Sequence, residues 1–189
     1  AVLRRLSRDG STMLESVPET KNIPEWMMAS WTEGYGADIA ERIASASLRE
    51  PPLDISVKTE PEGWTQKLGA TALPTGSLRR GFDGPIEAMP GFVEGAWWVQ
   101  DAAAALPARL LGDINGKRVL ELCAAPGGKT AQLLAAGAKV TAIDRLDPCP
   151  GRLRRNLSRP KLTALTLVED AIPWRQDVLF DPVLLDPPC

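Results

Sequence analysis

Apolar residues in the second half of the chain come in short blocks separated by glycine-containing or charged stretches of helix-forming composition. The blocks are short enough for buried strands, and the segments between them are long enough for one helix each. Strands alternating with helices predict an α/β fold, with a doubly wound, mostly parallel sheet. Within 119–130 we expect a strand, a loop and the beginning of a helix. Helices are expected over 130–136 and 152–158, and further strands over 139–144, 165–168 and 183–185.

The first fifty residues have a helical pattern instead. Residues 1–6 look like the end of a helix. A second helix is expected to start near Pro24, with Asn22 as its cap. A third covers 36–48 and stops before the linker formed by the prolines at 51 and 52. The large apolar residues of the second helix are expected to pack in a core: Trp26, Met27 and Trp31.

The pattern changes to a period of two at residue 53, where Leu53, Ile55 and Val57 alternate with polar residues and predict a half-buried strand. A short helix over 63–68, a turn over 74–77 and a strand over 78–82 follow, as in a small α/β module. Three basic side chains of this module are either phosphate ligands or solvated surface charges: Lys67, Arg79 and Arg80.

The next segment is rich in alanine and predicts a helix up to about residue 111, kinked at Pro107. The preceding Trp97 and Trp98 are expected to pack at a domain junction rather than stack on a base. The chain then divides into N-terminal helices and linker over 1–51, a small α/β module over 52–95 and a larger α/β domain over 96–189.

Composition removes several kinds of chemistry. The chain has 189 residues, 44% of them hydrophobic, and a net charge of -2, which leaves RNA binding open and argues against an extensive basic surface. It contains no histidine and three cysteines without a C-x-x-C pair. This excludes histidine bases and triads within the chain and predicts neither a disulfide framework nor a zinc site. We expect a soluble, cytoplasmic, monomeric protein with no metal and no membrane segment.

The stretch 119–130 holds the most specific local signal, because Gly127 and Gly128 lie between a strand and a helix whose N-terminus would face the same point. A P-loop would need glycine where Cys123 stands, and the G-x-G-x-x-G pattern of dinucleotide sites is absent. S-adenosylmethionine remains, since its methionine end needs backbone partners rather than a pyrophosphate cradle.

Three later strands end in a carboxylate. Because the carboxyl ends of parallel strands form the ligand crevice, Asp144 is placed to accept hydrogen bonds from a ribose diol. Asp170 could receive an adenine amino group, and Asp186 would lie near the reacting end of the cofactor. Each aspartate could instead cap a helix, but three at successive strand ends favour one shared site.

Residues 121–130 (ELCAAPGGKT) resemble motif I of the RNA cytosine-C5 methyltransferases of the Sun (RsmB, Nop) family, and 180–189 resemble its Asp-Ala-Pro-Cys motif, with Pro187 in place of alanine. Residues 22–26 and 100–101 resemble the bacterial ribosomal-RNA members, and 1–6 the end of their NusB-like domain. The prolines at 148 and 150 depart from the family pattern. The resemblance implies an S-adenosylmethionine site of seven loop residues and three aspartates: Cys123, Ala124, Ala125, Pro126, Gly127, Gly128, Lys129, Asp144, Asp170 and Asp186.

The resemblance also implies that 52–95 is the RNA-binding module and that 96–189 is the S-adenosylmethionine-binding methyltransferase domain. The implied substrate is a cytosine in small-subunit ribosomal RNA. Such enzymes add a cysteine thiolate to carbon 6 so that carbon 5 can attack the methyl group. In the RNA family that cysteine belongs to a later motif, and Cys189 matches a cysteine that assists product release; in the DNA enzymes a cysteine at this place is the nucleophile. We therefore expect a methyltransferase fragment without its main nucleophile. A non-catalytic RNA- or cofactor-binding fragment and a P-loop nucleotide-binding protein are the alternatives.

Overall fold

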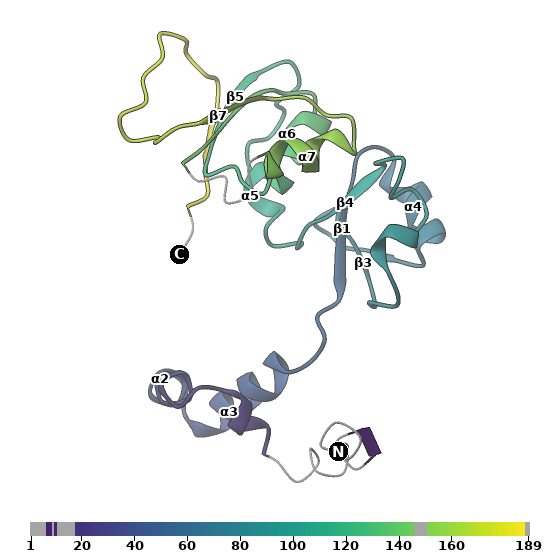
Figure 1. Ribbon diagram of the computed structural model, residues 1–189, viewed down its shortest axis with the longest axis vertical. Helices are drawn as coiled ribbons and strands as arrows, with labels where there is room; N and C mark the ends of the chain where they lie inside the picture. The colour runs from purple at the N-terminus through teal and green to yellow at the C-terminus, as the bar shows by residue number, and fades with distance from the viewer. Residues whose placement is uncertain (1–6, 9, 11–17, 146–150, 188–189) are drawn as a thin grey trace. The chain divides into compact units, whose positions relative to one another are not determined.

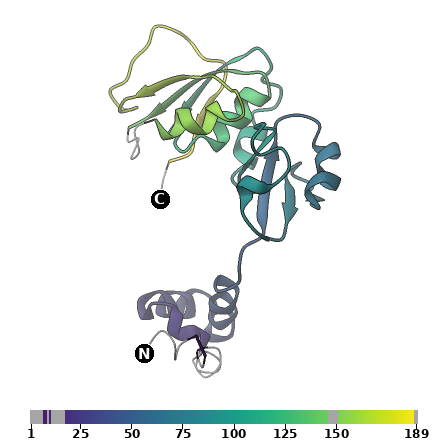
Figure 2. The same cartoon turned by 45° about the vertical axis from the view of Figure 1, so that its right-hand side comes forward.

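The computed structural model describes residues 7–8, 10, 18–145 and 151–187, arranged in two compact units, Ala1–Pro51 and Pro52–Cys189 (Figures 1 and 2). The boundary falls in the proline pair expected to be a linker. Residues 1–6, expected to end a helix, lie outside the described residues. Each unit is therefore considered by itself.

The N-terminal unit contains the 3-10 helix η1 (Glu19–Asn22) and the helices α2 (Glu25–Tyr35) and α3 (Ala37–Ser47). The expected helices are present, but the expected cap is wrong: Asn22 ends η1, and Pro24 is the N-cap of α2. Core packing of Trp26 is also wrong, because its side chain is 71% exposed and α2 contains no buried residue. Two short helices that pack mainly on each other enclose too little volume to cover a tryptophan.

The second unit begins with a four-stranded antiparallel sheet in the order β2-β3-β1-β4. Its core combines Leu53, Ile55, Leu78 and Trp97 with Leu68 of the covering helix. Asp54 and Ser56 are buried as well, so the expected half-buried strand is covered on both faces. The elements of this part are β1 (Leu53–Val57), α4 (Pro61–Leu68), β2 (Thr71–Ala72), β3 (Leu78–Arg80), η2 (Ile86–Ala88) and β4 (Trp97–Val99).

The alanine-rich segment differs most from its sequence pattern. Helix α5 covers only Leu106–Arg109, and Pro107 lies in its first turn, where a missing N–H costs nothing, so the kinked helix is wrong. β4 before it pairs with β1 through Ser56 and Trp98, and the Trp97 Nε1–H donates to the Pro90 carbonyl. Pairing with a distant strand and burial of both indole rings fix β4, while the alanines at 102–105 after it form turns rather than helix.

The rest of the unit forms the predicted parallel sheet, in the order β7-β6-β5-β8. Helices α6 and α7 lie on one of its faces and bury Leu133, Leu153 and Leu157 against Val119, Val140 and Leu184 of the strands (Figures 1 and 2). The direction of strand addition reverses at β5, which places a crevice at the carboxyl ends of its neighbours. The elements are β5 (Arg118–Leu122), α6 (Gly128–Ala135), β6 (Lys139–Asp144), α7 (Arg152–Ser158), β7 (Leu165–Val168) and β8 (Val183–Leu185).

The two sheets of this unit meet along a seam of cationic side chains and backbone carbonyls. Lys58 Nζ donates to Pro160 O at 2.7 Å. Arg159 Nη1 donates to Phe92 O at 2.8 Å and Trp97 O at 2.9 Å, and its guanidinium lies 4.1 Å from the Phe92 ring centroid. Burial lowers the pKa of Arg159. The seam fixes the small sheet against α7.

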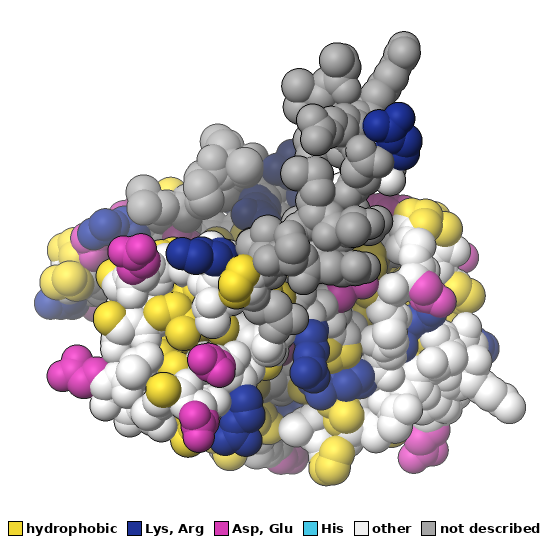
Figure 3. Space-filling view, turned by 90° about the horizontal axis from the view of Figure 1, so that it is seen from below, with side chains coloured by type: hydrophobic (Ala, Val, Ile, Leu, Met, Phe, Trp, Pro, Cys, Tyr) yellow, Lys and Arg dark blue, Asp and Glu magenta, His cyan; other side chains and the backbone are white. Residues whose placement is uncertain are grey.

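Charged side chains of both signs are interspersed over the face drawn in Figure 3, in keeping with the small net charge. Several large apolar side chains near β7 and β8 are exposed, including Ile172 at 81% and Leu179 at 89%. Within the described ranges no helix is both long and apolar enough to cross a bilayer.

Candidate functional site

A strained loop connects β5 to α6 and forms the centre of the site. Cys123 has φ 59°, a left-handed conformation that is uncommon for a residue with a side chain. The Ala124 N–H donates to Ile143 O at 3.1 Å, and Asn156 Nδ2 donates to Pro126 O at 2.8 Å. The surrounding β6 and α7 thus hold the loop in one shape.

The two glycines of the loop differ in what a side chain at their positions would contact. Gly127, at φ 104°, is the N-cap of α6, and a Cβ there would lie 2.5 Å from Leu153 Cδ1. Its missing side chain makes room for α7 rather than for a ligand. At Gly128 a Cβ would lie 3.8 Å from Gln100 Cγ, an ordinary contact, so protein packing does not require glycine there.

Two cavities share this loop. The larger, of about 740 Å³, lies at the ends of β6 and β7 and has an apolar wall made by Leu122, Ile143, Ala171, Ile172 and Leu185. The smaller, of about 370 Å³, is next to the N-terminus of α6 and the small sheet's β4, and includes Lys129 and Asp186. Both are lined by the same five residues: Cys123, Ala125, Pro126, Asp144 and Pro187.

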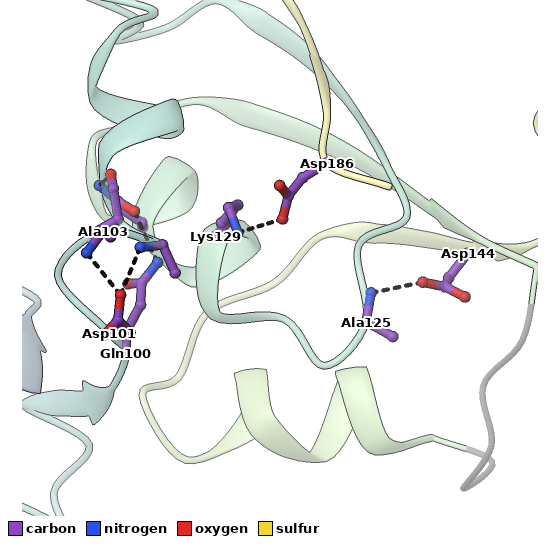
Figure 4. A network of polar contacts seen from close by, with 10 residues as sticks. Gln100, Asp101, Ala103, Ala125, Lys129, Asp144 and Asp186 are labelled. Carbon is purple, nitrogen blue, oxygen red and sulfur yellow. Dashed lines mark hydrogen bonds and ion pairs between the residues drawn. The ribbon is translucent and has the colours of Figure 1, made fainter. Parts of the chain in front are cut away.

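The three strand-end aspartates occupy different parts of this crevice, and Figure 4 shows two of them, Asp144 and Asp186. Asp144 ends β6 between the two cavities, and its Oδ2 accepts the Ala125 N–H at 2.9 Å. Asp186 lines the smaller cavity and pairs with Lys129 at 2.5 Å. Asp170 lines the larger cavity, where its Oδ1 accepts the Ile172 N–H at 2.9 Å.

These positions bring together most of the residues inferred from the sequence. Of the loop residues, Gly127 lines neither cavity and instead borders a third groove beside α7. The Ala124 and Ala125 N–H groups are hydrogen-bonded within the protein, to Ile143 O and Asp144 Oδ2. Cys189 lies outside the described residues.

Glu121 is the residue of the site to which the sequence assigned no role. It lies on β5, is 2% exposed and lines the smaller cavity. Its Oε2 is buried and accepts no hydrogen bond from the described residues. Burial raises the pKa of Glu121 to about 7, against smaller opposing effects of Thr130 and Lys129. The available signal was a lone carboxylate inside the apolar run 119–122.

Cys123 is the one free cysteine of the described residues. Burial, followed by the nearby carboxylates Asp144 and Asp186, raises the pKa of its thiol. A thiol kept protonated is a poor nucleophile, which agrees with a structural position for this side chain.

A hydrogen-bonded wall closes the smaller cavity on the side of the small sheet. Gln100 Nε2 donates to Gln132 Oε1 at 3.1 Å, and Asp101 Oδ1 accepts the N–H groups of Ala103 and Ala104 (Figure 4). Asp54 Oδ2 accepts the Ala102 N–H at 3.0 Å. The small sheet thereby positions one side of the crevice.

The basic residues considered as phosphate ligands are engaged within the module. Arg79 donates through Nε and Nη2 to both Asp54 oxygens, each at 2.7 Å, and lowers the pKa of that carboxyl. Arg80 donates to Asp83 and to Leu68 O. Lys67 Nζ lies 4.6 Å from the Trp64 ring centroid. Arg79 is therefore a structural residue, not a phosphate ligand.

Comparison with known proteins agrees with this geometry. Residues 108–189 match the family described as 16S rRNA methyltransferase RsmB/F. The whole chain aligns with ribosomal RNA small subunit methyltransferase B of Klebsiella pneumoniae at 32% identity, and of Pseudomonas putida at 33%. In both cases it spans 48% of the relative, so the chain covers about half the length of the curated relatives it matches.

Solved structures show the same fold. The crystal structure of PH0851 superimposes with a TM-score of 0.74 at 26% identity, over 88% of this chain and 41% of that one. NSun6 from Pyrococcus horikoshii, solved with SFG, gives a TM-score of 0.73 over 88% of this chain and 71% of that one. At 17% identity the second likeness concerns the fold alone.

Proposed function

We propose that residues 108–189, which match the RsmB/F family of 16S rRNA methyltransferases, hold S-adenosylmethionine in the crevice around the 123–129 loop. The observation that carries the proposal is the pair of cavities joined at Asp144. One is large and has an apolar wall, while the other holds the Lys129–Asp186 pair. S-adenosylmethionine has the same division into a nucleoside and a charged amino-acid end.

The larger cavity suits the nucleoside. Its volume of about 740 Å³ is within the usual range for small-ligand sites, and Leu122, Ile143 and Ile172 give it an apolar wall for a base. Asp144 stands at its inner end, where a carboxylate can accept hydrogen bonds from a ribose diol. Asp170 borders the same cavity and is the proposed acceptor for the adenine amino group.

The smaller cavity suits the methionine end and the reacting base. Lys129 supplies a cation beside Asp186, and the first turn of α6 directs its free N–H groups to the same region. Glu121 contributes a buried carboxylate whose Oε2 accepts no hydrogen bond from the described residues. When bound, S-adenosylmethionine supplies the methyl group, and these side chains orient its charged end and exclude water.

The proposed reaction is methylation of carbon 5 of a cytosine in small-subunit ribosomal RNA. The supporting observation is the resemblance of 180–189 to the Asp-Ala-Pro-Cys motif, together with the position of Asp186 in the smaller cavity. Attack at carbon 6 needs a thiolate, and the protonated Cys123 does not provide one. We assign Cys189 to product release and place the attacking cysteine in the part of the relatives that this chain does not span.

Isothermal titration calorimetry tests the cofactor assignment. Saturable heat from S-adenosylmethionine and none from ATP is the expected result, because position 123 lacks the glycine of a phosphate-binding loop. Binding of ATP alone would show a P-loop protein instead. Single-turnover assays with labelled methyl donor and small-subunit ribosomal RNA then test the chemistry. Cofactor and RNA binding without methyl transfer would identify the chain as a binding fragment.

A further inference from the structure

A third groove, of about 410 Å³, lies between the small sheet and the parallel-sheet domain. Phe92, Trp98 and Val99 form one side, and Arg155, Asn156 and Arg159 form the other. The glycines of the cofactor loop and Ala131 complete the floor. The two charged residues that line this groove are arginines, Arg155 and Arg159. Four carboxylates line the smaller cofactor cavity: Asp101, Glu121, Asp144 and Asp186.

The groove is adjacent to the reaction site. Val99, Pro126 and Gly128 line both the groove and the smaller cavity. A polymer whose reacting unit enters the smaller cavity beside Lys129 and Asp186 can therefore place a neighbouring unit in the groove without leaving the surface. The two compartments differ in charge, so the neighbouring unit meets arginines rather than carboxylates.

Arg155 is the cation of this groove that is available to a ligand. It is exposed, and its guanidinium makes no hydrogen bond or ion pair with the described part of the chain. Arg159, in contrast, is committed to Phe92 O and Trp97 O, and stacks on the Phe92 ring. Asn156 is fixed by its bond to Pro126 O. An exposed guanidinium such as that of Arg155, beside residues fixed by hydrogen bonds, is the arrangement expected for a phosphodiester contact.

We propose that this groove binds the sugar-phosphate backbone of single-stranded RNA next to the nucleotide that enters the smaller cavity, with Arg155 as the phosphate ligand. This inference rests on the proposed function and specifies where its RNA substrate runs. A base must leave its stack to reach a buried reaction site, so the flanking nucleotides need their own anchor. The Arg155 guanidinium matches a phosphate in charge and in its paired donors.

Arg155→Ala and Arg155→Glu test the groove, and Arg154→Ala and Arg154→Glu are matched controls on the same helix. Arg154 donates to Thr166 and lines a different cavity. Binding of a fluorescent single-stranded oligoribonucleotide is measured by anisotropy over a salt series. Arg155→Ala is expected to weaken binding about tenfold at low salt. It should also reduce the slope of log affinity against log salt by about 0.7, one phosphate contact.

Three controls separate this inference from the proposed function. Calorimetry with S-adenosylmethionine should give the same affinity for the wild-type chain and both Arg155 variants, and thermal unfolding shows whether each variant is folded. Equal loss at Arg154 and Arg155, or no RNA binding by the wild-type chain, would overturn the groove assignment while leaving cofactor binding intact. Binding of polyglutamate with the same dependence on Arg155 would assign the groove to polyanions in general and also overturn it.

Discussion

Lys129 Nζ lies 2.5 Å from Asp186 Oδ2, which joins the first turn of α6 to the end of β8 across 57 positions of sequence. The lysine side chain is 17% exposed and the aspartate side chain 50% exposed. The pair connects the two segments that carry the family resemblance, and it lies over the buried Glu121 in the smaller cavity. Because the aspartate end of the pair is half exposed to water, we expect the pair to contribute little to stability and infer that its importance lies in the site.

Lys129→Met should therefore separate stability from function. We expect the free energy of unfolding to change by less than about 1 kcal/mol. Where the wild-type chain transfers a methyl group in a single turnover, the rate for Lys129→Met should be lower by about 100-fold or more. Removing a preorganised electrostatic partner has an effect of this size. Lys117→Met is the control, since Lys117 is exposed and lies outside both cavities. Equal activity of the two variants would remove Lys129 from the site.

Asp144→Ala should weaken S-adenosylmethionine binding by about 10- to 100-fold, because charge-assisted hydrogen bonds to a ribose diol would be lost. Asp144→Asn keeps an oxygen that can accept the Ala125 N–H and should show a smaller loss. Asp177→Asn, an exposed change outside the two cavities, controls for net charge. If calorimetry gives the same affinity for Asp144→Ala and Asp177→Asn, the ribose assignment is wrong.

Glu121 predicts a particular pH dependence of stability. Its pKa rises from 4.5 to about 7 on folding, so the folded chain holds the extra proton between these values. Stability then falls as the pH rises through this window, by about 3 kcal/mol, and the full penalty is present above pH 7. Glu121→Gln should be the more stable protein at pH 8 and nearly equal to wild type at pH 4. Urea unfolding at both pH values measures this, and parallel pH profiles would contradict it.

The ion pair of Asp54 and Arg79 predicts unequal losses of stability when one or the other partner is replaced. Arg79→Met leaves Asp54, 5% exposed, with an uncompensated charge and should cost about 3 kcal/mol. Asp54→Asn leaves Arg79 free to reach water and should cost about 1–2 kcal/mol. Since Arg79 lowers the pKa of Asp54, this contribution is present above pH 3.8 and lost as the pH falls below it. If urea unfolding shows a larger loss of stability for Asp54→Asn than for Arg79→Met, this prediction is wrong.

The two loop glycines allow a matched comparison of packing with ligand binding. Gly127→Ala places a Cβ 2.5 Å from Leu153 Cδ1 at φ 104° and should reduce the free energy of unfolding by about 2–4 kcal/mol. Gly128→Ala meets only an ordinary contact with Gln100 and should change stability by less than about 1 kcal/mol. Its effect should appear in the affinity for S-adenosylmethionine. Thermal unfolding and calorimetry of both variants check the contrast.

The parallel-sheet domain was the most predictable part of the fold. Strands β6, β7 and β8 and helix α7 begin and end where the apolar blocks predict, because each block is short, continuous and bounded by turn residues or charges. In the crevice, Asp144, Asp170 and Asp186 follow from the rule that parallel strands end at one edge. Local pattern and topology were sufficient there.

Features that depend on distant contacts were not predictable. β4 was not predicted, because its three residues form a strand only through hydrogen bonds to β1, some forty residues earlier. Gly127 looks like a ligand glycine in the sequence, but its close neighbour Leu153 belongs to a later helix. Glu121 has an unusual pKa only because α6 and two other strand ends enclose it. None of these partners is visible in a local window of sequence.

The seam between the sheets has a consequence for sequence change. Its acceptors are the main-chain carbonyls of Phe92, Trp97 and Pro160, which every residue type carries. Substitution can delete these hydrogen bonds only from the donor side, at Lys58 or Arg159. It can also wedge the seam open at Gly95, where a Cβ would lie 2.1 Å from Arg159 O. Substitution of the acceptor residues leaves these hydrogen bonds in place, although replacing Phe92 would remove the ring on which Arg159 stacks. The hydrogen bonds that hold this wall of the reaction cavity therefore depend on three positions: Lys58, Gly95 and Arg159.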